Sequence, residues 1–187
     1  MTAASPAQIR QARPEDAAEL LGLIRRAMAL YAQNAGIETP LDAEMETAAD
    51  LQVHIAHDLV LVAEEDGRLI GTVRLVQQDQ DTVWFTRFSV LPERQRGGVG
   101  QLLYQAALAA AQKRGCRFML LHTALSNQNL VTFYQTRGFE QIDVSYERGY
   151  PRGLFLKTLK AAPGGKPPSA QGEIAAERAG AAPGPAV

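Results

Sequence analysis

The sequence has little of what several protein classes require. Only one cysteine, Cys116, stands among 187 residues, so neither an internal disulfide nor a cluster of thiolate zinc ligands can form. Lysine and arginine total 19 against 20 aspartates and glutamates, which leaves no basic excess for binding a phosphodiester backbone. No run approaches the ~18 consecutive apolar residues of a membrane-spanning helix. We therefore expect neither nucleic acid nor a membrane as partner.

Metal ligands are also scarce. His54 and His57 stand three residues apart, a spacing at which two side chains can share a metal ion, but no third ligand accompanies them. Surface histidines explain this pair more simply, and we expect no metal site.

The two ends of the chain have distinct compositions. Residues 1–5 lack the basic and apolar regions of a secretory signal, so we expect a cytoplasmic protein. The length suggests one domain, since roughly 150 residues per domain is typical. The last 27 residues contain nine alanines, five glycines, five prolines and no aromatic residue, too little apolar surface to offset the entropy cost of folding. The expected organisation is a folded domain over residues 6–160 and a disordered tail over residues 161–187.

Apolar spacing in the first third of the chain predicts two helices. Residues 17–28 repeat their apolar side chains at helical spacing. A second helix is expected from Thr39 to about His57. Its Thr39 hydroxyl would cap the first turn, and Asp42 three residues later would complete a capping-box-like arrangement.

Strands dominate the rest of the sequence. Asp66-Gly67 between two aliphatic runs predicts a type I′ hairpin, because both positions tolerate positive φ. Gly115 is expected to end a long helix in the left-handed conformation. The predicted strands are 8–10, 59–64, 69–76, 83–91, 118–123, 140–146 and 154–158, and the remaining helices are 98–114 and 127–136. The order β-α-α-β-β-β-α-β-α-β-β predicts an α/β (α+β) fold with helices on both faces of a mixed sheet.

A glycine-rich turn joins the strand ending near Leu91 to the long helix. Residues 92–101 read Pro-Glu-Arg-Gln-Arg-Gly-Gly-Val-Gly-Gln. Unpaired N–H groups at such a helix start converge on one point, and the helix dipole adds partial positive charge, so the turn suits a diphosphate. Two other phosphate-binding patterns do not fit. No Gly-Lys-Ser/Thr is present as in a P-loop, and the third glycine of the Rossmann pattern is missing.

This turn and a later segment together resemble a known family. Gln95-x-x-Gly98-x-Gly100 follows a Val-x-Pro strand end, and downstream come Asn127 and a Phe-Tyr-x-x-x-Gly-Phe segment at residues 133–139. The combination resembles the GNAT family of acyl-CoA-dependent N-acyltransferases, across most of residues 8–159. Leu130 departs from the pattern, since many members have alanine there. The resemblance implies a mostly antiparallel sheet of about seven strands flanked by four helices, and an N-acetyltransferase with acetyl-CoA as co-substrate.

The resemblance also implies which residues hold the cofactor. The backbone amides of the turn would bind the diphosphate of coenzyme A, and those of Phe88 and Val90 the pantetheine arm, with the amide near Val90 polarising the thioester carbonyl. Asn127 would bond the arm from the opposite side, and Tyr134 would place its phenol near the sulfur. The expected cofactor-binding residues are Phe88, Val90, Gln95, Arg96, Gly97, Gly98, Val99, Gly100, Gln101, Asn127 and Tyr134.

The reaction requires two proton transfers. An amine with a pKa of about 10.4 is almost entirely protonated at pH 7, so a base or a chain of water molecules must accept a proton before the amine attacks the thioester. The leaving thiolate must then be protonated, and a phenol within hydrogen-bonding reach can do this. Tyr134 is the expected general acid. The base stays open among Glu64, Glu65, Asp81 and His122.

The acceptor amine also stays open. The resemblance implies that the first two helices and the loop between the last strands wall its site. Four carboxylates of the second helix would suit a polycation, although acidic residues in a first turn already complement the helix dipole. Arg74 and Arg87 would alternatively clamp the carboxylate of an amino acid. The four carboxylates belong to Asp42, Glu44, Glu46 and Asp50.

Two further questions are left open by the sequence. We expect a small-molecule or peptide amine as the acceptor, and a homodimer is an open alternative to a monomer. The alternative to an enzyme is a non-catalytic acyl-CoA-binding regulatory module.

Overall fold

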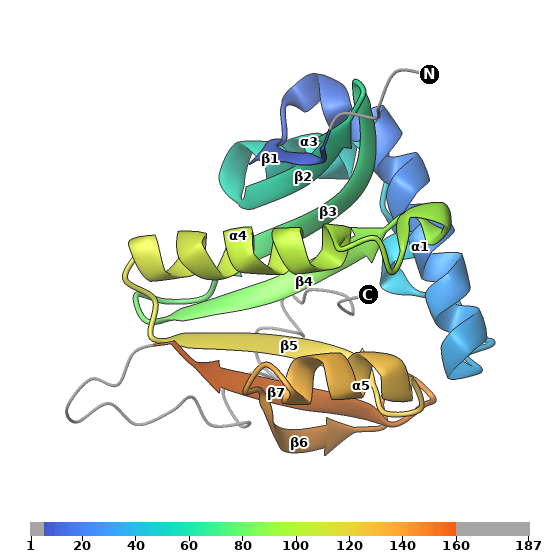
Figure 1. Ribbon diagram of the computed structural model, residues 1–187. Helices are drawn as coiled ribbons and strands as arrows, with labels where there is room; N and C mark the ends of the chain where they lie inside the picture. The colour runs from blue at the N-terminus through green and yellow to red at the C-terminus, as the bar shows by residue number, and fades with distance from the viewer. Residues whose placement is uncertain (1–5, 160–187) are drawn as a thin grey trace.

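The computed structural model describes residues 6–159, and the tail expected over residues 161–187 lies outside them (Figure 1). One sheet of seven strands has the order β1-β2-β3-β4-β5-β7-β6. Neighbouring strands are antiparallel except β4 and β5, which are parallel, so the mixed, mostly antiparallel sheet is confirmed. The strands are β1 (Gln8–Gln11), β2 (Leu59–Glu65), β3 (Arg68–Gln77), β4 (Thr82–Val90), β5 (Phe118–Ala124), β6 (Glu140–Ser145) and β7 (Arg152–Thr158).

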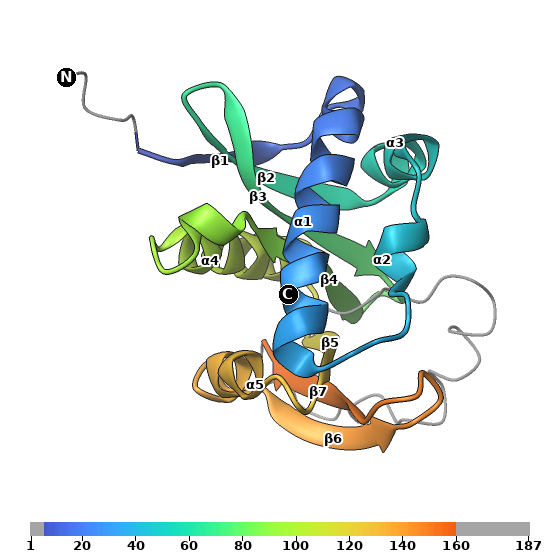
Figure 2. The same cartoon turned by 90° about the vertical axis from the view of Figure 1, so that its right-hand side faces the viewer.

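Helices cover both faces of the sheet, as predicted. Figure 2 shows α4 and α5 on one side and α2 and α3 on the other, where α1 also packs. None of the helices in residues 6–159 is long and apolar enough to cross a bilayer. The helices are α1 (Ala17–Ala35), α2 (Asp42–Met45), α3 (Ala48–His57), α4 (Val99–Lys113) and α5 (Gln128–Gln135), and short 3-10 turns stand at Pro14–Asp16 and Pro92–Arg94.

The single helix expected over residues 39–57 is wrong, because the structure divides it into α2 and α3. Glu46 between them is extended, with φ −63° and ψ 144°. Thr47 begins α3: its hydroxyl accepts a hydrogen bond from the Asp50 amide (3.2 Å), and the Asp50 carboxylate accepts one from the Thr47 amide (2.9 Å). The capping box thus lies at Thr47 rather than at Thr39. The break directs Glu46 toward the sheet.

The predicted tight turns are confirmed. Asp66 and Gly67 have φ of 50° and 75°, so both central positions of the β2–β3 hairpin are left-handed, as a type I′ turn requires. Gly115 has φ 83° and follows the end of α4. Local turn chemistry therefore specifies where β3 and β5 begin.

β4 and β5 diverge at one end of the sheet. They pair over only three positions, the last of which is Trp84 opposite Leu120. The rest of β4 has no ladder partner on the β5 side within the described residues. In the same stretch the register between β3 and β4 shifts, and Arg87 takes a left-handed φ of 50°, which is typical of a bulge. The divergence leaves a gap in the middle of the sheet, next to the glycine-rich turn.

α4 packs closely against β3 and so holds its first residues at the diverging end. Gly71 of β3 makes this approach possible, because a Cβ there would lie 2.8 Å from Leu103 Cδ1 and 3.2 Å from Val99 Cγ1. Both α4 side chains are buried. The start of α4 is therefore fixed by packing as well as by the turn that precedes it.

Candidate active site

The glycine-rich turn places free amides at the start of α4. Gly98 is the N-cap residue with φ 83°, and the first carbonyl bonded within the helix is that of Gly98, which accepts from the Leu102 amide at 3.1 Å. The amides of the first turn have no carbonyl one turn back to bind, so they remain available to a ligand. The Gln95 side chain donates to the Val90 carbonyl at 3.4 Å and ties the turn to the end of β4. The local geometry is that of an anion site.

A large cavity extends from this turn past the end of β4 to the start of α5. Its volume is about 770 Å³, which is within the range of small-molecule and cofactor sites. It is bounded by α1, the end of β4, the glycine-rich turn and the start of α5. The lining residues are Leu30, Tyr31, Asn34, Phe88, Val90, Pro92, Gln95, Arg96, Gly98, Gly100, Gln101, Asn127, Asn129, Leu130 and Phe133.

Most residues expected to bind the cofactor come together in this lining, although three do not. Gly97 lies in the same turn, Val99 points into the core with 5% exposure, and Tyr134 is fully buried behind the wall. Gly100 is packed tightly, since a Cβ there would lie 3.2 Å from the Phe88 ring. The expected residues in the lining are Phe88, Val90, Gln95, Arg96, Gly98, Gly100, Gln101 and Asn127.

Asn127 has two roles that are compatible. It is the N-cap of α5, with its side-chain oxygen accepting from the Leu130 amide at 3.3 Å. It is also a lining residue with only 5% exposure. Capping α5 therefore does not prevent Asn127 from contacting a ligand in the cavity.

Tyr134 carries a buried hydroxyl with no hydrogen-bond partner among the described residues. Its ring contacts Phe85, Phe133 and Phe139 at centroid distances of 5.4 to 6.3 Å, all of them edge-on. Burial raises the pKa of this phenol well above its ordinary value, so it is protonated at neutral pH. A buried hydroxyl without a hydrogen-bond partner reduces the stability of the fold.

Tyr31 of α1 reaches the same region and was not anticipated. Its hydroxyl accepts a hydrogen bond from the Ala124 amide at 2.7 Å, at the end of β5, and burial raises its pKa to about 12. Tyr31 continues the apolar stripe of its helix three residues after Met28, which is the only local sign of its burial. The contact between α1 and the diverging strands depends on tertiary packing, which the local sequence pattern does not predict.

Arg137 contacts two residues that line the cavity. Its guanidinium lies 3.5 Å from the centroid of the Phe133 ring and donates from Nε to the Gln101 side chain at 3.1 Å. Phe133 and Gln101 both line the cavity, on α5 and α4. Stacking and hydrogen bonding by one cation thus join the two helices beside the cavity.

None of the carboxylates considered as general bases lines the large cavity. Each forms an ion pair: Glu64 with Arg10, Glu65 with Arg94, and Asp81 with Arg117. His122 is different, because it lies buried on β5 and stacks on Trp84 at 5.1 Å. Burial, together with the charges of Arg152 and Arg148, lowers the pKa of His122 to about 2. This imidazole is neutral at pH 7 and a weak base.

The carboxylates expected to attract a polycation all have partners within the chain. Asp42 pairs with Arg148. Glu44 accepts from the Leu41 amide at 2.9 Å, Asp50 caps α3 as described, and Glu46 binds two arginines. Asp42 and Glu46 are thus neutralised by arginines, whereas Glu44 and Asp50 stay exposed at the starts of their helices.

Glu46 sits between Arg74 of β3 and Arg87 of the β4 bulge. One carboxylate oxygen, Oε1, accepts from both guanidinium groups, at 2.7 and 2.8 Å. Burial acts to raise the pKa of Glu46, but the charges of Arg74 and Arg87 outweigh it, and the pKa is lowered. The anion that these two arginines clamp is therefore a side chain of the protein.

Replacing Glu46 with Gln should destabilise the protein by about 3 kcal/mol at pH 7, because two buried guanidinium groups lose their shared counterion. The pKa of Glu46 lies below its ordinary value near 4.5, so its contribution to the free energy of unfolding is complete above pH 4.5 and is lost as the pH falls through the folded-state pKa. Urea denaturation at pH 7 and below pH 4.5 measures both effects. Glu44→Gln, which removes only a capping carboxylate, is the control, and an equal loss in both variants would contradict the prediction.

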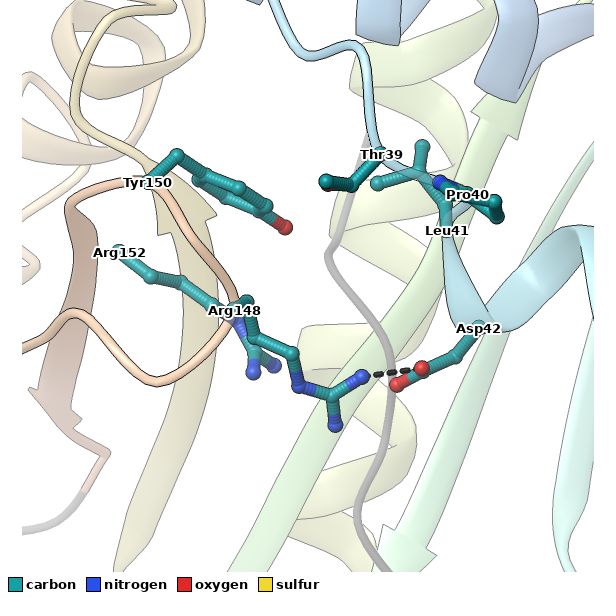
Figure 3. A pocket seen from close by; sticks show the side chains of 7 residues that line it. All are labelled: Thr39, Pro40, Leu41, Asp42, Arg148, Tyr150 and Arg152. Carbon is teal, nitrogen blue, oxygen red and sulfur yellow. Dashed lines mark hydrogen bonds and ion pairs between the residues drawn. The ribbon is translucent and has the colours of Figure 1, made fainter.

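A second, smaller cavity lies near the start of β7 (Figure 3). Its volume is about 70 Å³. Figure 3 shows Arg148 reaching from the β6–β7 connection to Asp42 at the start of α2, with Arg152 and Tyr150 beside it. The lining residues are Thr39, Pro40, Leu41, Asp42, Arg148, Tyr150 and Arg152. Among the described residues, no group of three or more His, Cys, Asp and Glu side chains is placed to hold a metal ion.

Solved structures of similar architecture are acetyltransferases. The PaiA N-acetyltransferase of Thermoplasma acidophilum, in complex with coenzyme A, is 22% identical with a TM-score of 0.72, covering 82% of this chain and 99% of that one. YncA of Salmonella typhimurium, a putative acetyltransferase with acetyl-CoA, is 16% identical with a TM-score of 0.69, covering 88% and 100%. The ribosomal-protein-S18-alanine N-acetyltransferase of Escherichia coli is 16% identical with a TM-score of 0.68, covering 86% and 99%. At these identities the likeness shows the fold.

Sequence comparison establishes the family. No curated protein matches the chain. The sequence model described as the acetyltransferase (GNAT) family matches residues 24–139, which is more than half of the chain and includes the glycine-rich turn, Asn127 and Tyr134. The chain therefore belongs to the GNAT family and is an acyltransferase.

Proposed function

We propose that the protein transfers an acetyl group from acetyl-CoA to a primary amine by direct attack within a ternary complex. The observation that carries the proposal is the cavity of about 770 Å³ that runs from the amides of the α4 N-terminus past the end of β4 to the start of α5. An anion site at one end and an extended channel at the other suit a diphosphate with a long acyl-bearing arm. Two structures of the same fold contain coenzyme A or acetyl-CoA, which supports this reading.

In the proposed position, the cofactor lies along the cavity with its diphosphate at the glycine-rich turn. The amides of the turn bind the diphosphate, and the pantetheine arm lies along β4 beyond Trp84, where no strand of residues 6–159 pairs with β4 on the β5 side. Phe88 and Val90 lie on this stretch, and Asn127 faces it from the start of α5. The amides that bind the diphosphate belong to Arg96, Gly97, Gly98, Val99, Gly100 and Gln101.

The chemical step makes a C–N bond and breaks a C–S bond. The neutral amine attacks the thioester carbonyl, and a backbone amide near Val90 stabilises the developing oxyanion, a contact worth roughly 2.7–4 kcal/mol in other enzymes. The coenzyme A thiolate leaves with the electron pair of the C–S bond and takes a proton from Tyr134 Oη. Two features support this role: the Tyr134 hydroxyl has no partner among the described residues, and burial raises its pKa, so the phenol carries its proton at neutral pH. The surplus proton of the amine passes to solvent through water, and Tyr134 regains a proton from solvent before the next turnover.

A thiol-release assay with acetyl-CoA and a panel of amines tests the proposal. We expect calorimetry to detect binding of coenzyme A, and at least one class of primary amine to release free thiol above the rate of thioester hydrolysis. Mass spectrometry of the product should show one acetyl group on the amine nitrogen. Tight binding without turnover of any amine would instead favour the non-catalytic acyl-CoA-binding module.

A further inference from the structure

One residue within a strand has a backbone conformation that non-glycine residues rarely adopt. Among residues 6–159, three non-glycine residues have a positive φ. Asp66 and Arg96 lie in turns, where left-handed residues normally occur, but Arg87 lies within β4 with φ 50°. A strained residue persists only where the surrounding structure fixes it, and such residues cluster at functional sites.

Arg87 is part of a β-bulge between β3 and β4. Thr72 and Arg74 of β3 are two residues apart in the chain. Their partners on β4, Ser89 and Thr86, are three residues apart, so β4 carries one additional residue at this point. Because successive side chains of a strand point to opposite faces, one additional residue exchanges the two faces for the rest of the strand.

The additional residue turns the end of β4 toward the large cavity. In a regular strand, Phe85 and Phe88 would point to opposite faces, because they are three residues apart. Instead, their ring centroids lie only 5.1 Å apart. Both rings also contact aromatic side chains of α4 and α5, so both point to that face of the sheet (Figure 2). Phe88 and Val90 line the cavity, and without the bulge they would point to the face of α2 and α3.

The bulge also selects backbone groups at the end of β4. Successive N–H groups of a strand point alternately to its two neighbours, so one additional residue changes which amides of residues 88–90 point away from β3. A backbone amide near Val90 is proposed to stabilise the oxyanion, and the pantetheine arm is proposed to lie along the same stretch. A shift of one residue here would therefore misplace both contacts.

A buried ion-pair cluster holds Arg87 from the opposite face of the sheet. Its Nη2 donates to Glu46 Oε1 at 2.8 Å, and Arg74 donates to the same oxygen at 2.7 Å. The side chains of the two arginines are only 5% and 4% exposed. Beside the bulge, the Thr86 hydroxyl donates to the Arg74 carbonyl at 3.3 Å and joins the two strands. Glu46 lies between α2 and α3, which both pack on α1, so the position of its backbone is fixed as well.

We propose that Arg87 is a positioning residue of the transferase and that Glu46 acts through it. Their ion pair keeps β4 bulged, and the bulge directs Phe88, Val90 and the nearby amides toward the bound cofactor. The inference rests on the proposed function and adds two residues, neither of which lines the large cavity. It also gives a role to the break between α2 and α3, which places Glu46 within reach of the strand.

Two substitutions of Arg87 separate the backbone conformation from the side chain. Arg87→Ala and Arg87→Gly both remove the guanidinium and leave Glu46 paired with Arg74, but only glycine adopts a left-handed φ without steric cost. With acetyl-CoA and the best acceptor of the amine panel, kcat of the alanine variant should fall by about 10²-fold, the loss expected from a misplacement of about 1 Å. The kcat of the glycine variant should exceed that of the alanine variant by at least about tenfold. The calorimetric Kd for coenzyme A should stay within about threefold in both, because the diphosphate binds at the turn and not at the bulge.

The outcomes distinguish this inference from the proposed function. An equal loss of kcat in the two Arg87 variants, or full activity of the alanine variant, would overturn the inference while the transferase stands. Turnover of no amine by the parent protein would overturn both. Asp66→Ala and Asp66→Gly are the matched control, because Asp66 has the same φ of 50° in a hairpin that does not line the large cavity. Their kcat values should be equal, and an alanine–glycine difference as large as at Arg87 would also overturn the inference.

Glu46→Asp tests the other partner of the ion pair. It keeps the negative charge between the arginines and shortens the side chain, so the protein should remain folded, which urea denaturation checks. This substitution should lower kcat of the parent protein by about tenfold and that of the Arg87→Gly variant by less than about twofold, because Glu46 acts through Arg87. An equal loss in both backgrounds would overturn the inference, even if Arg87→Ala did not fold.

Discussion

Gly98→Glu is expected to weaken binding of coenzyme A by at least about 10³-fold while the protein remains folded. Gly98 caps α4 and lines the large cavity, and a Cβ at this position meets no atom within 4 Å, so the larger side chain has room. The new carboxylate would lie among the amides proposed to bind the diphosphate. Two like charges about 5 Å apart repel by roughly 3 kcal/mol at an effective dielectric constant of 20, and the diphosphate carries more than one charge.

The control for this prediction is Gly98→Ala. With φ of 83°, any non-glycine residue incurs backbone strain of about 1 kcal/mol, and alanine does so without adding charge. Calorimetric titration with coenzyme A measures both variants, and thermal unfolding shows whether the strain is tolerated. We expect alanine to cost little affinity compared with glutamate. Tight binding by the glutamate variant would remove the phosphate site from this turn.

Tyr134→Phe should lower kcat by about 10²- to 10⁴-fold, the range expected for loss of a general acid, while affinity for coenzyme A stays near that of the parent protein. The same substitution is not expected to destabilise the protein. Because the hydroxyl is buried with no partner among the described residues, its removal should leave the free energy of unfolding unchanged or raise it by about 1 kcal/mol. Steady-state thiol release and urea denaturation measure the two effects.

Tyr31→Phe provides the matched comparison for stability. The Tyr31 hydroxyl accepts from the Ala124 amide at 2.7 Å, so its removal leaves a buried N–H unpaired and should cost about 1 kcal/mol or more. The two tyrosines therefore differ in the sign of the expected stability change. If Tyr134→Phe retained kcat within twofold on a good acceptor, the role of general acid would have to be reassigned.

Much of the fold could be predicted because its signals are local. The Asp66-Gly67 turn, Gly115 after α4 and the apolar runs of the strands depend on backbone preferences within a few residues, and the structure confirms them. The glycine-rich turn is also predictable from the local sequence, because the positive φ of Gly98 favours glycine at this position. The residues of that turn could therefore be named from the sequence alone.

The break between α2 and α3 could not be predicted, because its cause lies far along the chain. Glu46 is extended, and its carboxylate binds arginines 28 and 41 residues away. Thr47 with Asp50 is a good capping box, yet Thr39 with Asp42 has the same spacing and does not cap. Only the tertiary position of the arginines distinguishes the two, and the same holds for the arrival of Tyr31 at β5.

The short contact between β4 and β5 has a consequence for how the molecule holds together. Three residue pairs join strands β1 to β4 to strands β5 to β7, so the ladder is thinnest at the middle of the sheet. A pantetheine arm lying in that gap would bridge the two halves as an additional strand. Binding of the cofactor would then stabilise the folded protein. The free energy of unfolding would rise with the logarithm of the cofactor concentration above its Kd. When the cofactor is bound, hydrogen exchange should slow most for the amides of β4 and β5 that face the gap between these strands.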